Sequence, residues 1–289
     1  DSNQIWLQYG TQLSAEPPPM STPASEFVSE VLGIQQAIAS HQIQKAVAAR
    51  SMSVSQPMDL NRIWHSFIQL HEAYPAAFVF VLIHPHWGCW MGASPETLLR
   101  AENGEATVMS LAGTLTQDQD GWTSKEALEQ SVTSTFIREV LAAQEIHDAV
   151  ESNVGELQMG NIKHLMSEWR FKLPLPSASI QPNDVFDVVR NPLMLLIAQL
   201  HPTPAVGGYP QAEALNWLRN NESLSRALYS GFVGVMGSQN ANLFVTLRCA
   251  QLFQNGYTLY AGCGVNAGSD PNIEWKETAA KLALVGQYL

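Results

Sequence analysis

Apolar runs of strand length at both ends of the chain constrain its fold more than any other feature. Near the start they are residues 43–51, 77–84 and 106–114, and near the end they are residues 241–253 and 257–265. Each is too short to cross a bilayer and has the length and residue types of a β-strand. Helical patterns fill most of the middle. This order predicts an α+β fold, a layered α/β sandwich of large, mostly antiparallel sheets flanked by helices.

Helix signals divide the rest of the chain. Thr123 and Glu126 have the spacing of a capping box, and Asp270 followed by Pro271 is a typical helix start. No linker of convincing length follows residue 25, so we expect residues 1–25 to be an N-terminal lead-in and residues 26–289 to be one catalytic domain. The expected helices are residues 22–38, 124–143, 160–171, 185–200 and 211–219, and a last one from residue 271.

The balance of charged residues limits the kinds of partner that the protein can bind. With 15 basic and 26 acidic residues the net charge is −11, and no run of Lys and Arg offers a surface for phosphates, which argues against nucleic acid. An anionic substrate would need a local positive group or a metal. The three cysteines lack metal-ligand spacing, and no signal peptide or membrane span is visible. We therefore expect a cytoplasmic protein with reduced thiols and no membrane partner.

Carboxylates gather in the segment SDPNIEWKETAAK, residues 269–281. If a helix begins at Asp270, then Glu274, Glu277 and Lys281 share one face. Glu277 and Lys281 have the spacing of an ordinary surface ion pair, and the same face could instead serve a ligand. These residues alone leave both interpretations open.

Two further residues have unusual settings. Lys45 lies on the apolar face of its predicted strand, where burial would lower its pKa and let it act as a base; a snorkelling lysine on an edge strand is the alternative. Glu96 follows Pro95 in a predicted turn between strands, where an exposed carboxylate usually has no function. The loop HPTPAVGGYP, residues 201–210, is stiffened by prolines, and its glycine pair would let backbone approach a ligand.

Eight blocks then follow one another in a specific order: KAVAARS, GASPETLLR, LAGT, SKEALEQ, HPTPAVGGYP, YSGFVG, TLRCA and YAGCGVNAGSDPNIEWKETAAK. This series resembles the chorismate-utilising enzymes of menaquinone, siderophore, salicylate, folate and tryptophan pathways. The resemblance extends from Phe27 to the end, and the strand-rich N-terminal region usual in that family is shortened here. It implies the family's fold, chorismate as substrate, and a monomer, since members often act as monomers.

The resemblance also points to a branch of the family. A lysine in the KAVAAR strand, Ala112 in LAGT and the HPTPAV loop are similar to the enzymes that add water to chorismate, the isochorismate synthases. This implies a reversible, Mg²⁺-dependent isomerisation, with water attacking C2 and the C4 hydroxyl leaving. A salicylate synthase, which goes on to eliminate pyruvate, is the nearest alternative, and a truncated module that binds chorismate without turnover is another.

The resemblance assigns roles to single residues. Lys45 matches the general base, Glu96 the general acid, and His164, which we expect on a helix, lies near the leaving hydroxyl. The substrate-binding positions are Gly113, Thr203, Tyr229, Arg248, Gly262 and Lys281. Glu129 and Glu277 match the two Mg²⁺ ligands, with Glu126 and Glu274 as nearby carboxylates that hold metal-bound waters. Gln130 and Gly207 depart from the family pattern, in which histidine and cysteine or serine are usual.

Overall fold

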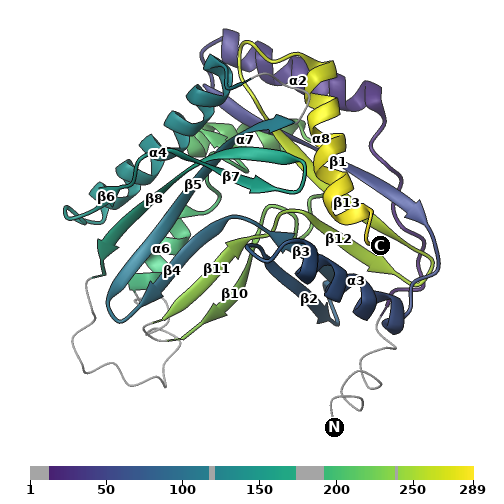
Figure 1. The fold of residues 1–289 in the computed structure, drawn as a ribbon. Helices are drawn as coiled ribbons and strands as arrows, with labels where there is room; N and C mark the ends of the chain where they lie inside the picture. The colour runs from purple at the N-terminus through teal and green to yellow at the C-terminus, as the bar shows by residue number, and fades with distance from the viewer. Residues whose placement is uncertain (1–12, 117–120, 174–191, 238–239) are drawn as a thin grey trace.

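Two antiparallel sheets dominate the computed structural model, which describes residues 13–116, 121–173, 192–237 and 240–289 (Figure 1). One sheet has six strands in the order β2 (Phe78–His84), β3 (Gly88–Ser94), β12 (Cys249–Phe253), β13 (Gly256–Val265), β1 (Lys45–Ser55) and β9 (Gly208–Tyr209). The other has seven: β10 (Phe232–Met236), β11 (Ala241–Val245), β4 (Thr97–Glu102), β5 (Glu105–Thr116), β8 (Ile162–Lys172) and β6 (Val150–Glu151), with β7 (Gly155–Met159) pairing with β8. The predicted fold class is confirmed.

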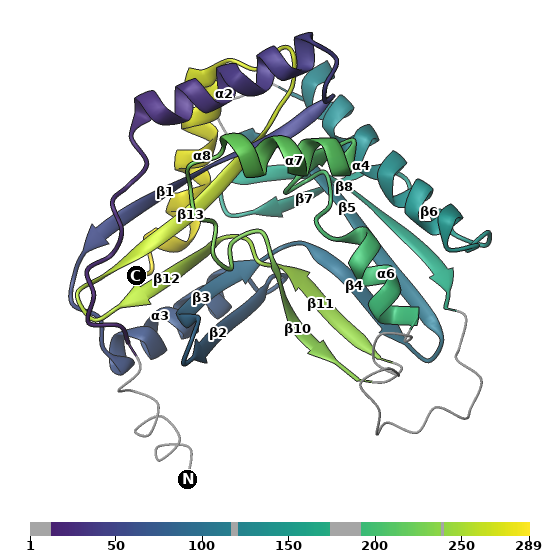
Figure 2. The same cartoon turned by 180° about the vertical axis from the view of Figure 1, so that it is seen from behind.

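Helices flank both sheets (Figures 1 and 2). Helix α2 (Ala24–Ala39) packs on β1, α3 (Leu60–Ala73) on β2 and β3, and α8 (Pro271–Gly286) on β13. On the seven-stranded sheet α4 (Ser124–Ala143) packs on β5 and β8, and α6 (Pro192–Leu200) on β4. Helix α7 (Gln211–Asn221) follows β9 and contacts β1. None of the helices in the described ranges has both the length and the apolar character needed to span a membrane.

The predicted helix starts are confirmed where capping residues marked them. Thr123 and Glu126 form a reciprocal capping box at the start of α4. The side chain of Asp270 accepts hydrogen bonds from the backbone N–H groups of Asn272 and Ile273 at the start of α8. Helix α3, whose N-cap is Asp59, was not predicted.

The helix predicted at residues 160–171 is wrong, because this segment forms strand β8. It lies between β5 and β7 and pairs with both, so tertiary pairing overrides a pattern that is ambiguous over such a short length. His164 is therefore on a strand. Of the helix predicted at residues 185–200, residues 192–200 are α6, and residues 185–191 lie outside the described part.

The chain passes from one sheet to the other at two adjacent places. Strand β3 lies in the six-stranded sheet and β4 in the seven-stranded sheet, and β12 and β11 are divided in the same way. The predicted continuous strand at residues 241–253 is thus broken, at Thr246–Arg248, where Arg248 has a φ of 47°. Backbone hydrogen bonds tie the crossings together, from Ala93 N to Arg248 O and from Val245 N to Glu96 O. Each crossing therefore carries one of the predicted site residues, Glu96 or Arg248.

Candidate active site

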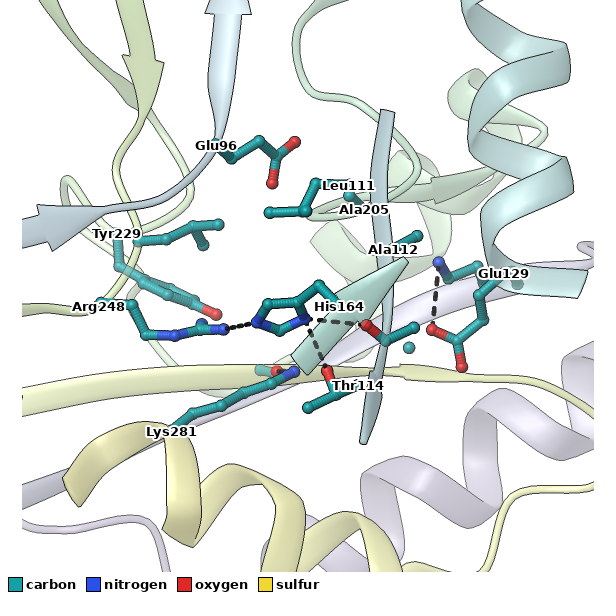
Figure 3. A pocket seen from close by; sticks show the side chains of 15 residues that line it. Glu96, Leu111, Ala112, Thr114, Glu129, His164, Ala205, Tyr229, Arg248 and Lys281 are labelled. Carbon is teal, nitrogen blue, oxygen red and sulfur yellow. Dashed lines mark hydrogen bonds and ion pairs between the residues drawn. The ribbon is translucent and has the colours of Figure 1, made fainter. Parts of the chain in front are cut away.

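A narrow pocket lies where the two sheets meet (Figure 3). Strands of both sheets and helices α4 and α8 supply its lining. Nine of the residues singled out from the sequence line it: Lys45, Glu96, Gly113, Glu129, His164, Tyr229, Arg248, Gly262 and Lys281. Thr203 is buried two positions from the lining residue Ala205, whereas Glu126, Glu274 and Glu277 are outside the lining.

Glu96 is buried, with 1% of its surface exposed, so the expectation of an exposed turn carboxylate is wrong. The crossing from β3 to β4 turns inward between the sheets, and Ser94 Oγ donates a hydrogen bond of 2.5 Å to Val245 O on the neighbouring crossing. Glu96 Oε1 has no hydrogen-bond partner among the described residues. Burial raises the pKa of Glu96 to about 8, although Arg248, Lys45 and Lys281 oppose this shift. Near pH 7 the group is mainly a protonated acid.

His164 is held between two fixed partners (Figure 3). Its Nδ1 lies 2.9 Å from Gly113 O, a pure acceptor, so this nitrogen carries the proton. Its Nε2 accepts a hydrogen bond of 2.9 Å from Arg248 Nη2. Burial, and then the charge of Arg248, lower the pKa of His164 to about 3. The imidazole is therefore neutral and serves to orient the guanidinium.

Lys45 lies inside the six-stranded sheet, since β1 pairs with β13 and β9, and it is 3% exposed. A snorkelling lysine on an exposed edge is thus excluded. Its Nζ is 3.8 Å from Glu129 Oε2. Burial lowers the pKa of Lys45, and the carboxylate of Glu129 opposes this only in part. A side chain at Gly264 would bring its Cβ within 2.7 Å of Lys45 Cε, so glycine leaves the space that this lysine occupies.

Carboxylates from α4 and α8 converge on one ammonium group. Lys125 Nζ lies 2.5 Å from Glu274 Oε1, 3.8 Å from Glu129 Oε1 and 3.9 Å from Glu277 Oε2. Lys281 Nζ is 2.6 Å from Glu277 Oε1. The predicted ion pair of Glu277 and Lys281 exists, but both side chains are largely buried, so it is not a surface pair.

Burial and the neighbouring charges shift the pKa values of Glu274 and Glu277 in opposite directions. Burial raises the pKa of Glu274, and the neighbouring charge of Glu277 raises it further. Burial also tends to raise the pKa of Glu277, but the ammonium groups of Lys281 and Lys125 bring it below its ordinary value. Glu277 is therefore held as a carboxylate.

The donor chemistry of this cluster suits a hard cation. The cluster offers carboxylate oxygens, and Glu274 Oε2 is buried with no hydrogen-bond partner among the described residues. Glu126 is less suited to hold the cation, because its Oε2 already accepts hydrogen bonds from Thr123 N and Oγ1 in the capping box. Within the described ranges, no group of three or more His, Cys, Asp or Glu side chains is arranged to hold a metal ion. Two carboxylates completed by water and a ligand are what Mg²⁺ commonly uses.

Comparison with known proteins places the chain in a family. A family profile described as "Chorismate binding enzyme" matches residues 11–289. The chain belongs to the chorismate-binding enzymes. It is 31% identical over 261 residues to the "Salicylate biosynthesis isochorismate synthase" of Pseudomonas aeruginosa, covering 85% of this chain and 50% of that protein. It is also 31% identical over 216 residues to "Isochorismate synthase EntC" of Escherichia coli K12. That match covers 72% of this chain and 53% of that protein.

The fold is shared with a solved structure. The menaquinone-specific isochorismate synthase MenF of Escherichia coli superposes with a TM-score of 0.73 at 23% sequence identity, over all of this chain and 68% of that one. The chain spans about half the length of the two curated relatives above.

Sequence reasoning about this chorismate-binding enzyme missed Lys125 and Thr114. Lys125 precedes Glu129 by four positions on α4, a spacing that could have indicated their 3.8 Å contact. Thr114 Oγ1 lies 3.4 Å from His164 Nδ1, and nothing in the sequence links two residues fifty positions apart. Gln130, the departure from the family pattern, donates hydrogen bonds to Ser110 O and Ser167 Oγ and so joins α4 to β5 and β8.

Proposed function

We propose that the chain is an isochorismate synthase, which interconverts chorismate and isochorismate with the help of Mg²⁺. The observation that carries this proposal is a pair of buried groups in one pocket whose pKa values are shifted toward each other, that of Lys45 lowered and that of Glu96 raised. Groups whose environments move their pKa values toward neutrality are suited to general base and general acid roles. The names of the relatives support the same reaction.

In the proposed forward reaction, the neutral amine of Lys45 takes a proton from water as the water oxygen bonds to ring carbon C2. The double bonds shift, the bond from C4 to its hydroxyl breaks, and the protonated carboxyl of Glu96 gives its proton to the leaving oxygen. The reverse reaction uses the same groups with their roles exchanged. The general base and the general acid both need to be shielded from bulk water, and the side chains of Lys45 and Glu96 are at most 3% exposed.

Arg248 and Lys281 supply positive charge for a dianionic substrate in an acidic protein. Arg248 Nε is buried and has no hydrogen-bond partner among the described residues, so this N–H is free for a substrate carboxylate. Its Nη2 is already used by His164, which fixes the plane of the guanidinium. Lys281 Nζ also donates to Gly262 O at 2.9 Å, which holds it at the pocket wall.

Glu129 and Glu277 would hold Mg²⁺, with Glu274 beside them. The bound cation would neutralise a substrate carboxylate and the repulsion among these acids. In the structure the ammonium groups of Lys125 and Lys281 balance the same charges. The proposed metal site thus rests on residues that are already grouped.

The deciding experiment is incubation with chorismate and Mg²⁺, followed by chromatographic separation of the products. We expect isochorismate and chorismate at equilibrium. Salicylate with pyruvate as the main products would identify a salicylate synthase instead. Unchanged chorismate, in a sample shown to bind it, would identify a module without turnover.

A further inference from the structure

A second cavity, of about 360 Å³, shares a chain segment with the proposed active site. The segment is residues 201–208, part of the proline- and glycine-bearing loop. Ala205 lines the active-site pocket, whereas His201, Val206 and Gly207 line the second cavity. Helix α7, which follows the segment (Figure 2), contributes further wall residues. The proposed reaction assigns no role to this cavity.

Most of the cavity wall is apolar. Val206, Leu215, Leu218 and Leu224 supply hydrocarbon surface, while the polar lining comes from His201, Arg219, Ser230 and an ion pair. A concave apolar surface with a few polar groups is typical of small-molecule sites.

The ion pair in the wall is already satisfied. Arg226 Nε lies 2.8 Å from Glu222 Oε1, its Nη1 donates to Val206 O at 2.7 Å, and its Nη2 donates to Val47 O at 2.7 Å. Glu222 and Arg226 therefore offer no net charge to a ligand.

Two polar groups in the wall remain open. The guanidinium of Arg219 is exposed and makes no ion pair or side-chain hydrogen bond within the described residues. His201 likewise has no side-chain hydrogen bond there, and its Nδ1 is buried. Burial lowers the pKa of His201 to about 4, so its ring is neutral near pH 7, and Nε2 is the ring nitrogen left for a ligand. The polar groups left for a ligand are thus one cation and one neutral imidazole, in a wall that otherwise consists mainly of apolar side chains.

We propose that this cavity binds a small carboxylic acid with an apolar ring. The carboxylate pairs with Arg219, the ring packs against Leu215 and Leu218, and His201 donates or accepts a further hydrogen bond. Charge–charge pairing with a planar guanidinium favours a carboxylate over an amide of the same shape.

Such a ligand would touch backbone that is bonded to the strand bearing Lys45. Val206 O accepts from Arg226, which also binds Val47 O, and Gly207 O accepts from Val47 N at 2.9 Å. Val47 is two positions from Lys45 on β1. A short, hydrogen-bonded path therefore connects the cavity wall to the strand that bears Lys45.

The test is a titration of the whole chain with 4-fluorobenzoate, followed by ¹⁹F NMR and by the ring proton signals of His201, assigned by their loss in His201→Asn. The isosteric 4-fluorobenzamide is the neutral control. The His201 signals report this cavity and not the substrate pocket, to which a carboxylate can also bind. The readout needs no turnover, so a failure of the proposed activity would leave it intact.

We expect a dissociation constant of about 1 mM for 4-fluorobenzoate, the affinity typical of a ligand this small, and about tenfold weaker binding of the amide. Arg219→Gln, at an exposed position, should weaken the acid about tenfold and leave the amide unchanged. Leu215→Trp should fill the cavity and abolish the His201 shift, whereas Arg138→Gln on α4 should change nothing. Unshifted His201 signals in the wild type, or equal binding of acid and amide in wild type and Arg219→Gln, would overturn the proposal.

Discussion

Glu96 and Lys45 show how burial sets chemistry at the scale of single residues. Both side chains would have their ordinary charges in water. Removed from solvent, the acid holds its proton above neutrality and the amine releases its proton more easily. The two shifts have one cause, the position of both residues at the meeting of the two sheets.

Replacement of either residue should reduce turnover strongly. We expect Lys45→Ala and Glu96→Gln each to lower kcat by about 10²–10⁴-fold, the usual contribution of a general acid or base. Steady-state rates of isochorismate formation check this. Lys163→Ala, at a half-exposed position, and Glu105→Gln, at an exposed one, are the matched controls and should keep wild-type rates. Near-normal turnover by Lys45→Ala would rule out the proposed base.

The pH dependence should carry the signature of Glu96. A general acid works only when protonated, so its contribution is present below its pKa and lost above it. With a pKa of about 8, kcat/KM should fall on the alkaline side with an apparent pKa near 8. The residual activity of Glu96→Gln should lack this alkaline fall, because the amide does not titrate. An unchanged alkaline limb in that variant would assign the titration to another group.

At the scale of elements, α4 and α8 each bring an acid to the same place. Glu129 and Glu277 are separated by about 150 positions, and only the packing of both helices beside β5 and β13 unites them. The sequence shows each helix through its cap, but the distance between helices depends on tertiary packing that no local pattern encodes.

Removal of the metal should therefore abolish activity. We expect a chelator to eliminate isochorismate formation, added Mg²⁺ to restore it, and Glu277→Ala to stay inactive at any Mg²⁺ concentration while remaining folded by circular dichroism. Glu213→Ala, an exposed acid on α7, should behave as wild type. Calorimetric titration with chorismate should show tighter binding with Mg²⁺ than without it, since the two ligands are linked. Equal affinity under both conditions would contradict a metal site in this cluster.

Much of this architecture could be predicted from sequence, and the failures have physical causes. Capping residues fixed the starts of α4 and α8, because a cap is a local hydrogen bond. Strand β8 was mistaken for a helix because its identity depends on its neighbours β5 and β7. The burial of Glu96 was missed because the crossing between sheets has no local signature. Lys45 and the face of Glu274, Glu277 and Lys281 stood out from the sequence pattern itself. Most of the other site residues were found only through the resemblance, and all of the roles remain predictions.

At the scale of the whole molecule, the same burial that prepares Glu96 for chemistry costs stability. The folded protein retains the Glu96 proton up to a pH of about 8, whereas the unfolded chain releases it near 4.5. Between these values the folded state binds more protons, so its stability falls as pH rises. Other groups titrate in this range as well, so Glu96 must be isolated by a comparison between variants.

The variant Glu96→Gln should lose less stability than the wild type as the pH rises. Between pH 5 and pH 9, we expect the free energy of unfolding of the wild type to fall by about 4 kcal/mol more than that of the variant. Urea denaturation at both pH values measures the difference, and Glu105→Gln serves as the control. Parallel falls in wild type and Glu96→Gln would mean that Glu96 ionises normally in the folded protein.

Strand β1 has a further consequence, for the order in which the molecule can be made. Residues 46–55 pair with residues 256–265, and the other neighbour of the strand is Gly208–Tyr209. During synthesis this apolar strand leaves the ribosome before both of its partners, which follow more than 150 positions later. Contacts of such long sequence separation form slowly, and an unpaired strand is prone to aggregate while it waits. The lysine at the centre of the proposed chemistry thus reaches its working position only after residues 256–265 have been synthesised.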